Sequence, residues 1–195
     1  MGKFKKPLIG IIVLIVIISW IAGIYNGMVK GQEQVESQWA QVENVYQRRA
    51  DLIPNLVATV KGYADFERQT LTDVIDARAK ATSVNINPQN LDENSLQMFQ
   101  EAQNQLTGAL GRLMVVVERY PELKANQNFL ELQSQLEGTE NRIAVERNRF
   151  NDVARQYNTL IRTFPKNILA SLFGFERKPY FEADQEASKP PKVEF

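Results

Sequence analysis

An uncharged apolar run near the N-terminus constrains this chain more than any other feature. The run covers residues 8–25, reads LIGIIVLIVIISWIAGIY and is preceded by three lysines. A helix rises about 1.5 Å per residue and needs roughly 20 mainly apolar residues to cross the hydrocarbon of a bilayer. We therefore predict a basic segment at residues 1–7 and a transmembrane anchor at residues 8–27. The side chains expected to form the anchor include Leu8, Ile11, Leu14, Ile17, Trp20 and Ile24.

A cleaved secretory signal is the alternative interpretation of this run. The apolar part of such a signal is usually about 7–15 residues long and ends in a cleavage site of small residues. The run here is longer, and Trp20 stands two positions before Ala22, where a small residue is required. We therefore expect a retained anchor. Short loops rich in Lys stay in the cytoplasm, and only Lys30 follows the run closely, so we expect a cytoplasmic N-terminus and an extracytoplasmic domain.

The composition excludes several classes of function. The chain has 23 basic and 23 acidic residues, so it lacks the positive field that nucleic-acid binding uses. It contains no His and no Cys, which removes the usual general base, the usual transition-metal ligands and every thiol nucleophile. The glycine-rich loops that bind phosphate are missing too. We therefore expect no nucleic acid, metal or cofactor as a partner, and no enzyme activity.

Apolar residues at steps of three and four predict long helical arms behind the anchor. The first arm runs from about residue 32 to residue 81. Pro54 lies inside this arm, and a proline in a helix removes one hydrogen bond and clashes with the preceding turn. We therefore expect a kink or a break near residues 52–54, and count the first arm as one bent helix or two.

Two further arms follow. The second arm begins near residues 91–92 and is ended by Pro121, and the third runs from near residues 123–126 to Pro165. No stretch shows the sustained alternation that is typical of a β-strand. The predicted fold class is all-α: an N-terminal transmembrane helix followed by an antiparallel bundle of long helices of the four-helix type.

Four charged residues interrupt the apolar stripes of these arms. They are Arg49 and Glu67 in the first arm, and Glu140 and Arg147 in the third. One interpretation is a polar seam that binds a ligand or a partner. We favour pairing between helices that fixes their register, because buried charges need partners and both arms offer opposite charges.

A strip of asparagines lies beside the stripe of the third arm, at Asn141, Asn148, Asn151 and Asn158. Such amides could bind a polar ligand, but we favour a solvated face or hydrogen bonds between helices.

The segment from residue 164 to residue 183, FPKNILASLFGFERKPYFEA, is rich in phenylalanine. It could dock on the open apolar end of the bundle or lie on a membrane. We favour docking, because a helix on a membrane surface would carry more Lys and Arg. We therefore assign residues 28–183 to the bundle, and residues 184–195, which hold two prolines, to an extended tail.

Three segments resemble the LemA family of small bacterial membrane proteins. They read WAQVENVYQRRADLIPNLVATVKGYADFE, then ERYPELKANQNFLELQSQLEGTENRIAVERNRFNDVARQYN, and finally IRTFP…FGF…YF. The resemblance covers nearly all of residues 39–181 in the family's order. It implies a bundle of long helices held by one N-terminal helix, with no established biochemical activity, and some relatives are linked to shaping internal membranes. Residues that recur in the family include Arg48, Arg49, Asp51, Leu52, Pro54, Asn55, Leu56, Lys124, Ala125, Asn126, Glu140, Asn141 and Arg142.

Three classes of function compete. We favour a membrane-anchored helical interaction or scaffold protein of the cell envelope without catalytic activity, because the chain offers amphipathic surfaces and no catalytic set. The alternatives are a bundle that assembles into rings or coats and shapes membranes, and an accessory subunit or polar-ligand receptor. The expected partners are membrane lipid and either another protein or a second copy. The candidate interaction or register residues are Arg49, Asp51, Asn55, Glu67, Glu140, Asn141 and Arg147.

Overall fold

The computed structural model describes residues 5–62 and 67–182, with side chains from Ile9 onward. The predictions for residues 1–4, for the side chain of Leu8 and for the tail at residues 184–195 therefore lie outside the described residues. Within the described part every regular element is helical, as the sequence predicts. The elements are α1 (Lys5–Lys61), α2 (Arg68–Ser83), the 3₁₀ turn η1 (Pro88–Asn90), α3 (Glu93–Val117), α4 (Pro121–Lys124), α5 (Gln127–Arg162) and α6 (Lys166–Phe173).

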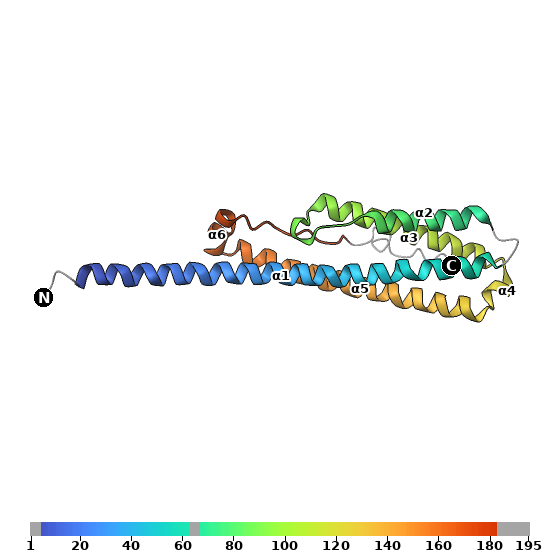
Figure 1. Cartoon of the computed structure of the whole chain (residues 1–195), viewed down its shortest axis with the longest axis horizontal. Coiled ribbons are helices and arrows are strands. Elements are labelled where there is room, and N and C mark those ends of the chain that lie inside the picture. The colour runs from blue at the N-terminus through green and yellow to red at the C-terminus, as the bar shows by residue number, and fades with distance from the viewer. Residues whose placement is uncertain (1–4, 63–66, 183–195) are drawn as a thin grey trace, which may run out of the picture.

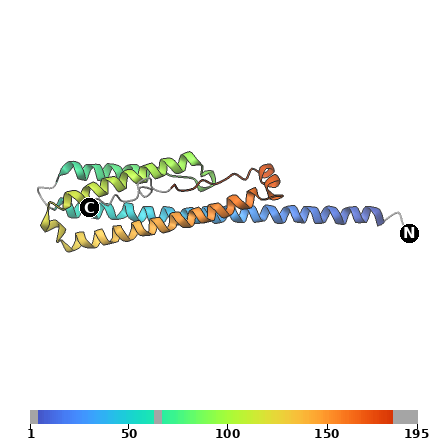
Figure 2. The same ribbon diagram turned by 180° about the vertical axis from the view of Figure 1, so that it is seen from behind.

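The four long helices form an antiparallel bundle from which the N-terminal part of α1 projects alone (Figures 1 and 2). α1 packs closely along α5, and α2 packs along α3. The two pairs are joined where α2 contacts α1. α6 lies at the end of the bundle from which α1 projects, and α4 lies at the opposite end.

α1 is one continuous helix that joins the apolar run to the bundle. It has 57 residues, which corresponds to about 85 Å. The anchor side chains Ile11, Leu14, Ile17 and Trp20 are exposed over the whole circumference of the projecting part. Burial begins at Met28, where the helix enters the bundle. The glycine-containing passage at residues 26–31 is helical throughout, so no non-helical linker separates the apolar run from the bundle.

Of the kink or break predicted near Pro54, the break does not occur. α1 continues through Pro54 to Lys61, although the proline offers no amide to the carbonyl of Ala50 one turn earlier. Arg78 of α2 supplies the missing donor, because its Nε donates to the Ala50 carbonyl oxygen at 2.7 Å. A side chain from another helix therefore replaces the hydrogen bond that the proline removes. The first arm is divided further on, between Lys61 and Arg68.

Side-chain caps set the start of two helices near the predicted positions. Asp92 caps α3: its carboxylate accepts the amide of Ser95 at 2.7 Å, while the Ser95 hydroxyl accepts the amide of Asp92 at 3.1 Å. These hydrogen bonds to Ser95 lower the pKa of Asp92, because they favour the ionised carboxylate. Asn126 caps α5 by accepting the amide of Phe129 at 3.1 Å.

The core consists of two hydrophobic clusters stacked along the bundle. The cluster nearer the anchor centres on Trp39, whose ring lies 5.3 Å from that of Phe99 and 5.6 Å from that of Phe150. The distal cluster contains Leu56 and Leu113 among its fully buried side chains. A layer of polar side chains lies between the two.

Candidate functional site

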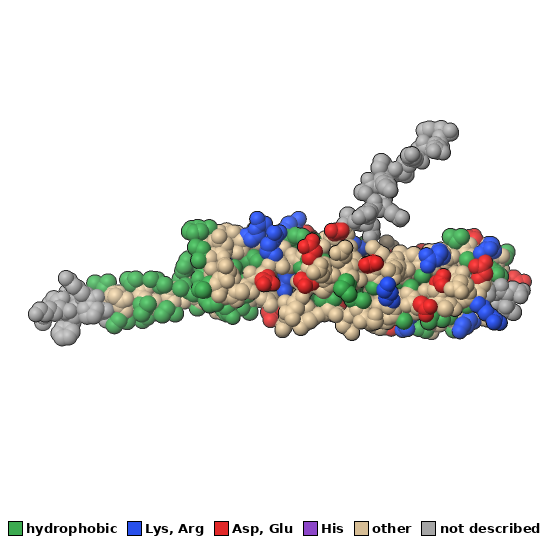
Figure 3. Space-filling view, turned by 90° about the horizontal axis from the view of Figure 1, so that it is seen from above, with side chains coloured by type: hydrophobic (Ala, Val, Ile, Leu, Met, Phe, Trp, Pro, Cys, Tyr) green, Lys and Arg blue, Asp and Glu red, His purple; other side chains and the backbone are tan. Residues whose placement is uncertain are grey.

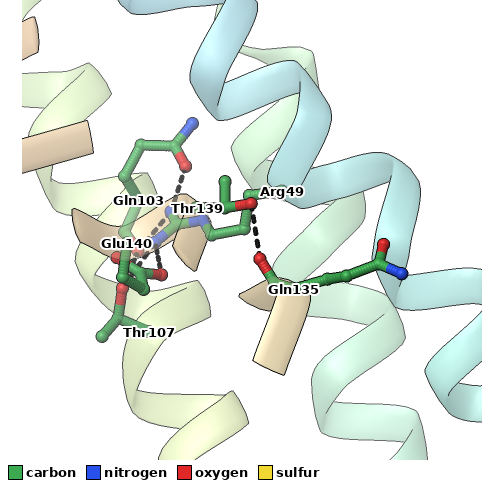
Figure 4. Close-up of polar contacts among 6 residues, drawn as sticks. All are labelled: Arg49, Gln103, Thr107, Gln135, Thr139 and Glu140. Atoms are coloured by element: carbon green, nitrogen blue, oxygen red, sulfur yellow. Dashed lines mark hydrogen bonds and ion pairs between the residues drawn. The ribbon is translucent and has the colours of Figure 1, made fainter. Parts of the chain in front are cut away.

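The polar layer consists of Arg49, Gln103, Thr107 and Glu140, from three different helices (Figure 4). Nη1 of Arg49 donates to Glu140 Oε1 at 2.6 Å and to Thr107 Oγ1 at 2.9 Å. Nη2 donates to Gln103 Oε1 at 2.5 Å. Gln103 then donates through Nε2 to the carbonyl of Ala81 in α2, at 3.2 Å. The layer therefore links all four long helices by hydrogen bonds.

Burial differs sharply across the ion pair of this layer. The side chain of Arg49 is 2% exposed, whereas that of Glu140 is 42% exposed. The guanidinium also lies 5.2 Å from the centre of the Tyr46 ring, which favours a cation. Its Nε has no hydrogen-bond partner within the described part of the chain. Arg49 is thus a buried cation held by hydrogen bonds and an ion pair. Glu140 is the member of the polar layer that is exposed to solvent.

An open groove of about 1430 Å³ runs beside the polar layer and is lined by α1, α2, α3 and α5. Charges of both signs line it, and the described residues contain no cluster of three or more Asp and Glu side chains that could hold a metal ion. The polar surface suits a ligand that offers both hydrogen-bond donors and acceptors. The charged residues of the lining are Arg49, Asp73, Asp76, Lys80, Glu101, Arg112, Glu140, Arg147 and Glu182.

Residues 175–182, which we call the strap, run back along the bundle in an extended conformation and end at this groove. Two side-chain amides of α5 hold the strap by paired hydrogen bonds to its backbone. Asn158 donates to the Lys178 carbonyl at 2.7 Å and accepts the Lys178 amide at 2.8 Å. Asn151 makes the same pair with Phe181, at 3.0 and 2.8 Å. Half of the predicted asparagine strip therefore binds the chain's own backbone.

Further contacts fix the middle and the C-terminal end of the strap. Arg147 donates to the Glu182 carbonyl at 2.7 Å and lies 5.1 Å from the centre of the Phe181 ring. Phe181 itself is buried against Trp39 in the cluster near the anchor. Lys178 is buried and donates to the carbonyl of Gln89 at 2.8 Å. Burial lowers the pKa of Lys178, although two nearby glutamates oppose this effect.

Tyr157 of α5 packs against α1 and has a phenol whose pKa is shifted. Its ring is buried against Gly31, where an added Cβ would lie 3.2 Å from the ring. Burial, followed by the charges of Glu176 and Glu36, raises the pKa of Tyr157 to about 12. The hydroxyl has no hydrogen-bond partner among the described residues.

The structure brings three of the candidate residues into one place. Arg49, Glu140 and Arg147 all line the groove, and the first two form an ion pair. Neither Glu140 nor Arg147 is buried, so their expected position facing the core is only partly correct. Both side chains line the groove, where no other helix covers α5.

The remaining candidate residues lie elsewhere. The sequence pattern wrongly places Glu67 on the core stripe. Glu67 precedes α2 at the distal end, is exposed, and pairs with Arg119 at 2.8 Å; its side chain makes no capping hydrogen bond. Its position follows from the division of the first arm just before it. Asp51, Asn55 and Asn141 are exposed and do not line this groove.

Sequence reasoning missed the roles of Arg78, Thr107 and Gln103. Gln103 carried a signal, because it stands where the stripe of α3 calls for an apolar side chain, and such a position implies a polar partner. Pro54 carried a signal for Arg78, because the carbonyl that it leaves free requires some donor. Thr107 carried none.

These features define a class of protein: a bundle of long helices continued by one N-terminal helix that is long and apolar enough to cross a membrane. The sequence model of the LemA family matches residues 38–195. The chain therefore belongs to the LemA family.

Relatives of known name agree with this assignment. Magnetosome protein MamQ of Magnetospirillum gryphiswaldense is 27% identical over 199 residues, covering 93% of this chain and 73% of the relative. Magnetosome protein MamQ 1 of Paramagnetospirillum magneticum is 27% identical over 210 residues, covering 97% and 77%. Protein LemA of Metamycoplasma hominis is 23% identical over 160 residues, covering 82% and 69%. Neither name denotes an enzyme, and the chain is a membrane-associated helical protein.

Proposed function

We propose that this protein is a membrane-anchored, non-catalytic contact protein that binds a polar segment of a partner protein in its groove. The observation that carries the proposal is the open groove beside the polar layer, on a bundle that α1 joins directly to the apolar run. A continuous helix is stiffer than a flexible linker, so it would keep the groove at a fixed distance from the membrane.

The charges of the groove favour a protein segment over a small ion. Arg49 is already paired with Glu140, and Lys80 lies one turn from Asp76 on α2. A simple anion or cation would therefore meet repulsive as well as attractive groups. A polypeptide carries donors, acceptors and charges of both signs, and it can match such a surface along its length.

Photo-crosslinking in native membranes tests the proposal. A photoreactive amino acid replaces Asn104, which is exposed in the groove, or Val145, which is exposed on α5 outside it. We expect a discrete crosslinked partner from position 104 and not from position 145. The same products from both positions, or none from position 104, would contradict the proposal. A product of two copies of this chain would instead favour the self-assembling bundle.

The proposed orientation places the N-terminus in the cytoplasm and the bundle outside it. The support is the three lysines before the apolar run. Because the chain contains no Cys, the variants Lys3→Cys and Glu186→Cys each carry a single thiol. In intact cells, a membrane-impermeant thiol reagent should label only position 186. Labelling only at position 3 would reverse the orientation.

A further inference from the structure

The end of the bundle nearest the anchor carries large apolar side chains that the described chain leaves uncovered. Ile168 and Leu172 stand one turn apart on α6 and are 59% and 74% exposed. Phe164, just before α6, is 76% exposed. The opposite face of α6 docks on the end of the bundle through the buried Ala170, as favoured from the sequence. Docking and a membrane contact therefore use different faces of the same helix. Figure 3 shows hydrophobic side chains gathered where the bundle meets the projecting part of α1.

Ring contacts set the height of this apolar surface relative to the anchor. Phe173 at the end of α6 lies 5.1 Å from the ring of Tyr25, and Phe175 lies 5.6 Å from it. Tyr25 is the last residue of the apolar run. The 18 residues of that run are about 27 Å long as a helix, against a hydrocarbon thickness of about 30 Å.

Because the run is about as long as the hydrocarbon is thick, an anchor formed by it would place Tyr25 at the edge of the bilayer. α6 contacts Tyr25 and would lie at the same level. Aromatic and aliphatic side chains at this level are typical of helices that lie in the interface plane.

Basic side chains border the same surface. Arg162, Lys166 and Arg177 make no side-chain hydrogen bond or ion pair to any described residue. Arg162 and Arg177 both line a hollow of about 510 Å³ between the end of α5 and the segment after α6. In Figure 3 Lys and Arg side chains lie close to the apolar end of the bundle. Unpaired cations beside an apolar face fit the phosphate groups of lipids.

We propose that α6 and Phe164 form a second membrane contact, which inserts into the interface of the same bilayer that α1 crosses. Arg162, Lys166 and Arg177 bind lipid phosphates around it. A single spanning helix can rotate and tilt freely, whereas two contacts fix how the bundle stands on the membrane. The occupant of the apolar face is thus lipid, because the face is continuous with the lipid-facing surface of the anchor.

Spin labels on the full-length protein test this proposal. The single-thiol variants are Leu172→Cys on α6 and, as a control, Val115→Cys on α3, where the side chain is 71% exposed far from the anchor. Each labelled protein is reconstituted into vesicles of phosphatidylethanolamine and phosphatidylglycerol. Accessibility to oxygen, which concentrates in lipid, is compared with accessibility to a water-soluble nickel complex. Both positions are exposed, so neither variant is expected to disturb folding.

We expect the label at position 172 to lie about 5–10 Å into the boundary between headgroups and acyl chains, and the label at position 115 to lie in water. Equal nickel accessibility at both positions would overturn the proposal. Low accessibility of position 172 to both reagents would also overturn it, because that result means protein covers the surface. The vesicles contain no other protein, so a lipid signal cannot come from an unknown partner.

Discussion

Replacing Arg78 with methionine should destabilise the bundle through a carbonyl on another helix. Ala50 is 3% exposed, and Pro54 supplies no amide to its carbonyl oxygen. The Arg78 Nε donates to that oxygen at 2.7 Å. Methionine keeps most of the aliphatic packing of the arginine side chain and removes the donor, so the variant isolates the hydrogen bond.

The magnitude follows from the burial of the acceptor. A hydrogen bond to a charged group contributes about 1.5–3 kcal/mol, and a buried carbonyl without a partner costs about 1–3 kcal/mol. We therefore expect Arg78→Met to lower the free energy of unfolding by about 2 kcal/mol. In a Pro54→Ala background the amide of residue 54 donates to the Ala50 carbonyl instead, so the same change should cost less than about 1 kcal/mol. The coupling free energy between the two sites is then about 1–2 kcal/mol.

The assay is guanidinium unfolding of the four proteins of this cycle in mild detergent, followed by far-ultraviolet circular dichroism. Arg68→Met serves as the control, because Arg68 begins the same helix, is exposed and makes no side-chain hydrogen bond within the described part of the chain. It should change stability by less than about 0.5 kcal/mol. An equal cost of Arg78→Met with and without Pro54 would refute the idea that Arg78 replaces the missing amide.

Three further predictions concern α5 and its neighbours. Gly31→Val should destabilise the bundle by about 1–3 kcal/mol in thermal unfolding, because even a Cβ at position 31 would lie 3.2 Å from side chains of α5. The control Gly27→Val places its side chain in open space and should be nearly neutral. Tyr157→Phe should be neutral or stabilising at pH 7, because it removes a buried hydroxyl without a partner within the described part. Above pH 10 the free energy of unfolding of the wild type should fall relative to that of this variant, because Tyr157 ionises first in the unfolded chain and its pKa in the folded protein is about 12. A constant difference in the free energy of unfolding between the two proteins across that range would contradict this. Asn158→Asp removes the amide that donates to the strap and should speed trypsin cleavage within it, whereas Asn148→Asp at an exposed site should not.

The helical arms could be predicted because their signals are local. Periodic apolar residues, the caps Asp92 and Asn126 and the stops at Pro121 and Pro165 all act within a few residues of the backbone they affect. The break expected at Pro54 failed for the opposite reason. Its cost depends on whether a donor reaches the free carbonyl, and that donor comes from a different helix.

The candidate site was predictable only in part. The charge interruptions Arg49 and Glu140 are visible in the sequence, and the structure joins them at 2.6 Å. Glu67 followed the same pattern but lies exposed just before α2 at the distal end, because the first arm is divided there. Pairing between helices depends on how the arms fold back, which spacing along one arm does not encode.

The sequence by itself determined the apolar helix and the helical class, because length, hydropathy and periodicity are properties of neighbouring residues. The tertiary structure alone decided that α1 is uninterrupted, that Gln103 completes a polar layer across four helices, and that two asparagines hold the strap. It also decided that α6 packs at the height of Tyr25. Each of these features consists of contacts between residues far apart in the chain. Their stability depends on burial and on partners that only the folded bundle brings together.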